Sequence, residues 1–335
     1  MGMTKIESIR KRPYLAIMII FILLLCMSQV VPDVWIDPFI RIMIYILLGM
    51  STNILVGYIG MMPMGQALFV GIIAYTYSIL MGKLNVAIVP AIFLSLLVSV
   101  AASVFVGYFC LRGGEGFAVG FIFMGFNTLF SLICNKVQYL GFEAGLTGAE
   151  RFVFMETNAE FLPFVILVVG ICYLLIYRLL HSPAALVMKG IRDNPERVTY
   201  MGVNIFNFRL LVFVISTFFT AIAGLLYSMY LRGAYPNMAS NNFSVQLLMM
   251  CIVGGMYHFT GPTWGAIFIC LVFSRLSNYT IYWQSIVGIL LVLSVLFMDG
   301  GFMGFFDKIK IRMKLKKQKN NVKITAKVQL INVNR

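Results

Sequence analysis

The chain has 335 residues, of which 61% are hydrophobic and 11% are charged, and its mean hydropathy is +0.92. Soluble globular domains carry a charge on about a quarter of their residues, so this composition excludes a soluble fold. The net charge of +14 does not indicate nucleic-acid binding, because ten of the 26 Lys and Arg residues lie in the last segment, 307–335. Such a basic flank after an apolar segment is typical of a topology determinant resting on anionic lipid.

The sequence therefore predicts an all-α polytopic membrane protein whose membrane domain covers residues 14–306. The basic residues of 1–13 precede a first apolar run, 14–31, which is compatible with a signal peptide or a first transmembrane helix. No small-residue cleavage site follows it, so we expect a retained helix. Nine further apolar segments follow, some shorter than the roughly 20 residues that a spanning helix needs. We expect about 8 to 10 transmembrane helices, with broken or half-helices among them. The later segments are 38–58, 66–81, 85–111, 115–134, 161–180, 208–231, 244–257, a returning segment that ends at 278, and 282–298.

The distribution of basic residues predicts the orientation of these segments. With both termini in the cytoplasm, most Lys and Arg residues flank the cytoplasmic ends of the segments, as the positive-inside rule requires. The polar interval 181–208 then falls in the cytoplasm, and the polar interval 135–160 falls outside. We expect a multi-pass membrane protein with both termini in the cytoplasm.

Glycine and proline interrupt two of the apolar regions. Gly57, Gly60 and Gly65 surround Pro63, and later Gly254 and Gly255 precede Gly261. Helix breakers at membrane depth are tolerated where the backbone is buried in protein or lines a water-filled cavity. Close packing of helices through small residues explains the same pattern, so both interpretations stay open.

The interval 181–208 is polar but keeps apolar residues at helical spacing, which predicts two short helices. Pro183 stands at the first turn of one helix, where its missing N–H costs nothing. Asn194 is a suitable N-cap and Pro195 a suitable first residue for the second helix. Gly202 ends that helix in the manner of a C-terminal glycine, and an ordinary loop between spans is the alternative.

The run RDNPERVTYMG in this interval resembles the cytoplasmic coupling loop of ABC-importer permeases of the branched-chain amino-acid type. Gly202 matches the glycine of that loop, whereas Arg197 and Val198 stand where the family has alanines. The resemblance implies a cytoplasmic coupling helix that docks on an ATPase subunit, with Val198 or Met201 as the apolar anchor. The residues implied in this coupling are Arg192, Asp193, Asn194, Glu196, Arg197, Val198, Met201 and Gly202.

Two other stretches are similar to the same family. Residues 57–75 resemble its glycine-rich stretch, and residues 244–268 resemble its final apolar run, paired glycines and glycine-proline turn. The resemblance implies separate ATPase subunits, a second homologous permease subunit or a second copy of this chain, an extracytoplasmic solute-binding protein and membrane lipid as partners. Branched-chain or other amino acids are the implied substrates, and urea, sugars and nucleosides remain alternatives.

The sequence contains no motif of an enzyme. It has no phosphate-binding loop of the form G-x-x-x-x-G-K-[ST], no H-E-x-x-H, and only two histidines. We expect no catalytic activity, cofactor or metal, so the energy for transport must come from a partner. The alternative is a stand-alone secondary transporter or channel. Glu115 stands in a turn and Asp299 at a segment end, so no Asp or Glu lies within a predicted span to couple an ion.

Polar residues inside the apolar segments are the candidates for a translocation path, since they are costly there unless they face a cavity or a partner. The uncharged candidates are Asn53, Gln66, Asn127 and Gln246, and Arg41 and Arg275 are charged examples. Hydrogen bonding between helices is the alternative for each of them.

Overall fold

The computed structural model describes residues 13–28, 32–114, 116–152 and 155–279, and the isolated positions 288, 289, 292, 301, 303 and 304. Within this part of the chain the elements are almost all helices, which confirms the predicted fold class. Five helices are long and apolar enough to cross a membrane, and four shorter apolar helices accompany them. The predicted segment 282–298 and the tail 307–335 fall almost entirely outside the described residues.

The first half of the chain forms α2 (Pro13–Met27), α3 (Asp33–Asn53), the π-helix η1 (Ile54–Ile59), α4 (Ala67–Gly82), α5 (Ile88–Arg112) and α6 (Phe117–Lys136). The second half forms α7 (Asn158–Leu180), α8 (Pro183–Asp193), α9 (Pro195–Tyr200), α10 (Ile205–Leu231), α11 (Asn241–Gly254) and α12 (Gly261–Tyr279). Between them lie the short elements η2 (Gln138–Leu140), η3 (Phe142–Ala144), β1 (Leu146–Thr147), β2 (Gly233–Ala234) and η5 (Pro236–Ala239).

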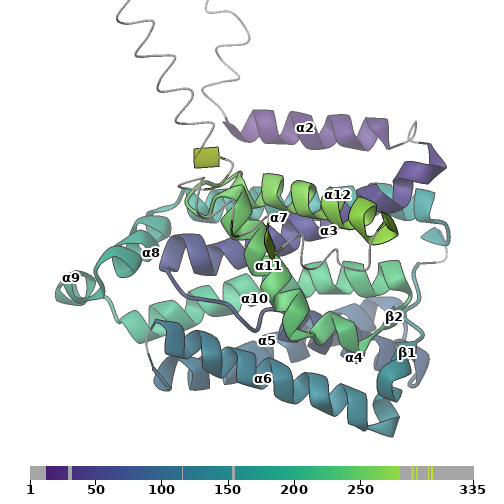
Figure 1. Ribbon diagram of the computed structural model, residues 1–335, viewed down its shortest axis with the longest axis horizontal. Helices are drawn as coiled ribbons and strands as arrows, with labels where there is room; N and C mark the ends of the chain where they lie inside the picture. The colour runs from purple at the N-terminus through teal and green to yellow at the C-terminus, as the bar shows by residue number, and fades with distance from the viewer. Residues whose placement is uncertain are drawn as a thin grey trace, which may run out of the picture.

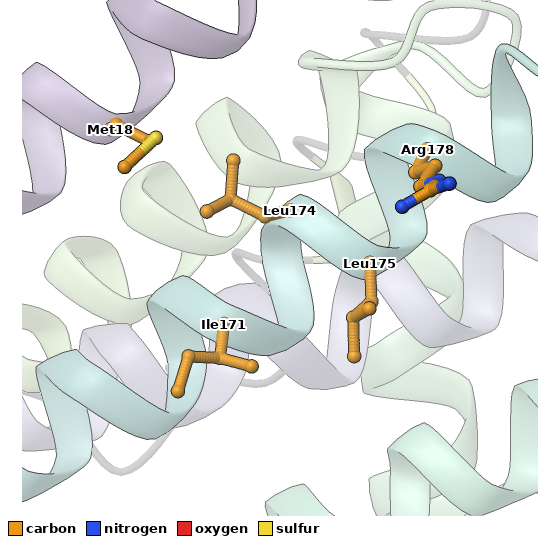
Figure 2. Close-up of a pocket in the computed structure, with 5 residues that line it drawn as sticks. All are labelled: Met18, Ile171, Leu174, Leu175 and Arg178. Carbon is orange, nitrogen blue, oxygen red and sulfur yellow. The ribbon is translucent and has the colours of Figure 1, made fainter.

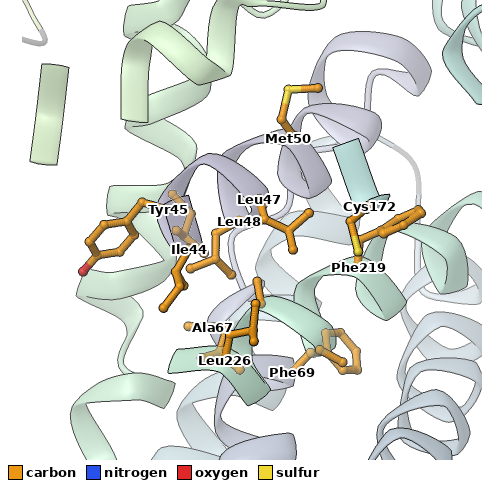
Figure 3. Close-up of a cluster of buried hydrophobic side chains, with 14 of the residues drawn as sticks. Ile44, Tyr45, Leu47, Leu48, Met50, Ala67, Phe69, Cys172, Phe219 and Leu226 are labelled. Atoms are coloured by element: carbon orange, nitrogen blue, oxygen red, sulfur yellow. The ribbon is translucent and has the colours of Figure 1, made fainter. Parts of the chain in front are cut away.

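Helix α3 occupies the centre of the bundle. Residues 43–53, its second half, are all buried, as is typical of a helix that other helices surround. It packs against α7, α10, α11 and α12, while α10 also packs against α4 and α5. Figure 3 shows Leu47 and Leu48 of α3 in a cluster with Phe219 and Leu226 of α10, all of them buried. This core fixes the broken end of α3 relative to the rest of the bundle.

Helix α5 lies at the periphery of the bundle and packs through small residues. Ser95, Ser99 and Ser103 recur at intervals of four and are buried. A Cβ added at Gly107 would lie 2.8 Å from the ring of Phe213 on α10, so the two helices approach closely at this point. The opposite face of α5 exposes large apolar side chains, for example Phe93, which suits contact with lipid.

An apolar groove separates part of α2 from α7 (Figure 2). Its volume is about 560 Å³, and its lining is formed by Met18, Ile171, Leu174, Leu175 and Arg178. Nearby, the ring of Phe21 lies 5.5 Å from that of Tyr173 and holds α2 on α7. Among the described residues that line the groove, only Arg178 is polar, and none of the buried polar side chains described below is among them.

The two ends of the bundle differ. At one end β1 pairs with β2 in antiparallel register, Leu146 opposite Ala234, and ties the loop before α7 to the end of α10. At the other end α8 and α9 project from the bundle (Figure 1). The sequence did not predict the strand pair, because two residues a strand are too few for a periodic pattern.

Candidate functional site

The end of α3 is broken where the sequence predicted it. The helix widens into η1, and Gly60 then adopts a positive φ of 76°. The chain continues without regular structure until α4, and a Cβ at Gly65 would overlap the backbone carbonyl of Phe123. Gly60 is thus required by its backbone conformation and Gly65 by a close approach.

A second break joins α11 to α12. Gly255 has a φ of 110°, and a Cβ at Gly254 would overlap the carbonyl oxygen of Gly261. The two breaks meet, because a Cβ at Gly57 on η1 would overlap the carbonyl oxygen of Met256 in this turn. All the glycines selected from the sequence therefore lie at positions where the backbone bends or approaches another segment closely.

Gln66 lies fully buried beside α10. Its Nε2 donates to Thr220 Oγ1 at 2.5 Å and is 3.3 Å from Ser216 Oγ. The hydroxyls of Thr220 and Ser51 lie 2.9 Å apart, so α3, α4 and α10 share one polar cluster. The Oε1 atom of Gln66 is buried and makes no hydrogen bond with any described residue.

Asn127 forms a second polar group with α11. Its Nδ2 donates to Asn241 Oδ1 at 2.6 Å and approaches Ser244 Oγ at 3.5 Å. Ser244 Oγ in turn accepts the backbone N–H of Ala67 at 3.0 Å, next to Gln66. Gln246 does not join them: it is half-buried and makes no hydrogen bond within the described part of the chain.

Asn53 is the third buried amide. Both its Oδ1 and Nδ2 are buried and have no hydrogen-bond partner among the described residues. A buried polar group without a partner costs about 1–3 kcal/mol, so such a position favours water or the polar part of a ligand. Asn53, Gln66 and Asn127 thus each keep a buried amide oxygen that has no hydrogen-bond partner among the described residues.

The sequence did not predict the serine and threonine hydroxyl groups that surround Gln66 and Asn127. Ser216 and Thr220 stand four residues apart on α10, and this spacing is the signal that would have placed both hydroxyls on one helix face. Ser51 stands beside Thr52 and Asn53, and Ser244 lies two positions before Gln246. Neither short polar run indicates which helix its hydroxyl group would meet.

Helices α8 and α9 have the predicted boundaries. Pro183 is the first residue of α8, and Asn194 caps α9 by accepting the backbone N–H of Arg197 at 3.1 Å. After α9 the chain turns at Gly202, whose φ is 82°. Met188 and Ile191 of α8 are buried, which holds this helix pair against the bundle.

Arg192 points toward the bundle. Its Nη1 donates to the carbonyl oxygen of Gly57 at 2.5 Å, and its Nε pairs with Asp193 at 3.0 Å. Glu196 and Arg197 are exposed on α9. Within the predicted coupling run, Arg192 therefore faces the bundle, whereas Glu196 and Arg197 face away from it.

The apolar residues of α9 correct one expectation from the sequence. The sequence gives Val198 or Met201 as the apolar anchor. Val198 does not fit this role, because it is only 7% exposed and packs against Gly190 of α8. Met201 is 81% exposed, and its neighbour Tyr200, which the sequence analysis did not select, is 91% exposed. A six-residue helix must bury one side to be stable, and Val198 lies on that side.

The chain is similar in sequence to known permease components. The family model described as "Branched-chain amino acid transport system / permease component" matches residues 36–296. The permease protein LivM of a high-affinity branched-chain amino acid transport system is 24% identical in Salmonella typhimurium and 23% identical in Escherichia coli. Each match spans 290 residues, 78% of this chain and 68% of the relative. No solved structure matches the chain. The chain therefore belongs to the family of permease components of branched-chain amino acid transport systems.

Proposed function

We propose that this chain is a transmembrane permease subunit of an ATP-driven importer of branched-chain or other amino acids. Separate ATPase subunits bind at α8 and α9, and the chain itself supplies the path through the membrane. The observation that carries the proposal is the helix pair α8–α9, which the bundle holds through buried residues while its tip exposes Tyr200 and Met201.

The tip of α9 has the composition of a docking surface. Tyr200 and Met201 are large apolar side chains beside the exposed charges of Glu196 and Arg197. Apolar anchors within a polar rim are typical of protein interfaces, and tyrosine is frequent at positions that dominate the binding energy. Asp193 pairs with Arg192 in the last turn of α8, Asn194 caps α9, and Gly202 turns the chain back toward α10.

We propose that the translocation path follows the buried amides. The buried amide oxygens of Asn53, Gln66 and Asn127 have no partner in the described part of the chain. Such groups are costly unless they face a ligand or water in another state of the protein. Gln246 of α11 is half-buried and would join the path at its edge.

The proposed assembly places α8–α9 and both termini in the cytoplasm of a bacterial cell with the permease domain 14–306 in its inner membrane. A second homologous permease subunit, or a second copy of this chain, completes the path, and an extracytoplasmic solute-binding protein delivers the substrate. Branched-chain amino acids are the first substrates to test, because the LivM relatives are named for their transport.

The experiment measures association with the ATPase subunits of the same bacterium. Wild-type chain is expected to copurify with them, and loaded binding protein is expected to stimulate their ATP hydrolysis. The double change Tyr200→Ala and Met201→Ala removes both apolar anchors. If each side chain contributes about 1–2 kcal/mol of binding free energy, the affinity for the ATPase should fall at least tenfold.

The matched control is Val34→Ala, which truncates a residue that is 82% exposed at the opposite end of α3. It should leave the affinity for the ATPase unchanged. The purified chain alone, reconstituted in liposomes, should accumulate no labelled leucine. Ion-driven accumulation by the isolated chain would overturn the proposal in favour of a secondary transporter.

A further inference from the structure

The broken end of α3 receives a cap from a different element. The last carbonyl groups of a helix lack partners within the helix, and a basic side chain nearby satisfies them and interacts favourably with the helix dipole. In η1 the carbonyl oxygen of Gly57 accepts a hydrogen bond from Arg192 Nη1 at 2.5 Å. Arg192 stands 135 positions further along the chain, in the last turn of α8.

The Arg192 side chain contacts three segments at once. Its stem lies over Gly60, where an added Cβ would be 2.7 Å from Arg192 Cγ. Its guanidinium lies 5.1 Å from the centre of the Tyr257 ring in the turn between α11 and α12. It also pairs with Asp193 beside it, and the side chain is 25% exposed. One side chain of α8 thus connects both breaks in the membrane helices.

We infer that Arg192 is the positioning residue that transmits movement of α8 and α9 to the membrane path. This inference rests on the proposed function. Because the guanidinium caps η1 from outside, displacement of α8 withdraws a charge-assisted hydrogen bond from the Gly57 carbonyl and weakens the π-helix. Gly57 in turn bounds the buried amide of Asn53, since a Cβ at Gly57 would lie 2.6 Å from Asn53 Oδ1.

The same geometry identifies a matched control. Lys189 lies one turn earlier on α8, carries the same charge and approaches the Tyr58 ring of η1 at 5.4 Å. It makes no hydrogen bond to η1 among the described residues, and it is exposed. Loss of charge on α8 is therefore the same in Lys189→Met and Arg192→Met, while loss of the cap occurs in Arg192→Met alone. Methionine also keeps an apolar stem over Gly60.

The test uses the full complex with its ATPase subunits and binding protein in liposomes, and measures amino acid transported per ATP hydrolysed. Arg192→Met should still copurify with the ATPase. Its ratio of amino acid transported to ATP hydrolysed should fall about tenfold, because the change removes one hydrogen bond made by a charged group. Lys189→Met should keep the ratio within about twofold. Arg192→Lys restores a cationic donor and should recover part of the ratio.

The outcomes separate this inference from the proposed function. Failure of the wild-type chain to bind any ATPase removes the proposed function itself. If the wild type is coupled and Arg192→Met keeps a normal ratio, the inference is wrong. Loss of ATPase binding in Arg192→Met also overturns it, since Arg192 would then belong to the docking surface. If Arg192→Met is absent from the membrane, the transport-to-hydrolysis ratio of Arg192→Lys is compared with that of Lys189→Met. A lower ratio for Arg192→Lys supports the inference, and equal ratios overturn it.

Discussion

Gly57 stands on η1, where the end of α3 contacts the turn between α11 and α12. Gly57→Ala should lower the free energy of unfolding by about 1–3 kcal/mol, because the added Cβ overlaps the Met256 carbonyl and forces two backbone segments apart. The midpoint of thermal unfolding of the detergent-solubilised protein measures this effect.

Gly49 provides the control on the same helix. A Cβ there would meet its nearest atoms, those of Pro262, at 3.5 Å, which is ordinary contact. Alanine also favours a helix over glycine by roughly 1 kcal/mol, so Gly49→Ala should be neutral or slightly stabilising. Equal destabilisation by both changes would mean that the close approach of Gly57 to Met256 makes no particular contribution to the free energy of unfolding.

The elements that distinguish this bundle from a set of straight spans are its short ones. Helix α9 has six residues, far fewer than an isolated helix needs for stability. Its order depends on the Asn194 cap, on Val198 packed against Gly190, and on the turn at Gly202. Each of these features places Tyr200 and Met201 at the tip.

Gly202→Val should therefore disturb α9 without changing the membrane helices. The φ of 82° is strained for a β-branched residue by about 1–2 kcal/mol or more, although the space around the Cβ is open. We expect normal amounts of protein in the membrane and at least tenfold weaker association with the ATPase, measured by copurification at graded ATPase concentrations.

Gly116 is the appropriate control for this change. Its φ is 59° and the space around its Cβ is also open, but it lies in the turn between α5 and α6. Gly148 of the opposite end is less suitable, since a Cβ there would lie 2.8 Å from Gly82. If Gly116→Val weakens ATPase association as much as Gly202→Val does, α9 has no specific part in docking.

At the scale of the whole molecule, the β1–β2 end and the α8–α9 end should face opposite sides of the membrane. Five of the six cysteines are buried and Cys26 is exposed, so Cys26→Ser gives a suitable background for labelling. Cysteine at Glu150, near β1, should react with a membrane-impermeant maleimide in intact cells. Cysteine at Arg197 should react only after permeabilisation.

Reporters fused to the N-terminus and to the C-terminus should both give a cytoplasmic signal, as the basic flanks 1–13 and 307–335 predict. Labelling of Arg197→Cys in intact cells, or a C-terminus outside, would contradict this orientation and with it the cytoplasmic docking of α8 and α9.

Much of this architecture was predictable from the sequence because local chemistry determines it. Hydropathy predicts the apolar helices, since each one must bury its backbone hydrogen bonds within itself in a membrane. The ends of α8 and α9 follow from Pro183, Asn194 and Gly202, whose backbone preferences act within a few residues. The breaks at Gly60 and Gly255 follow from the same kind of preference.

Contacts between distant segments were decided by the tertiary structure alone. Gln66 and Gln246 look alike in the sequence, but only Gln66 meets hydroxyl groups of another helix. Val198 and Met201 are both apolar residues of the coupling run, yet one packs on α8 and the other is exposed. Arg192 is recognisable in the sequence as a residue of the coupling run, but only the packing of α8 on η1 brings it to the Gly57 carbonyl. Helix propensity and hydropathy act along the chain, whereas the partner of each side chain depends on which helix faces lie together in space.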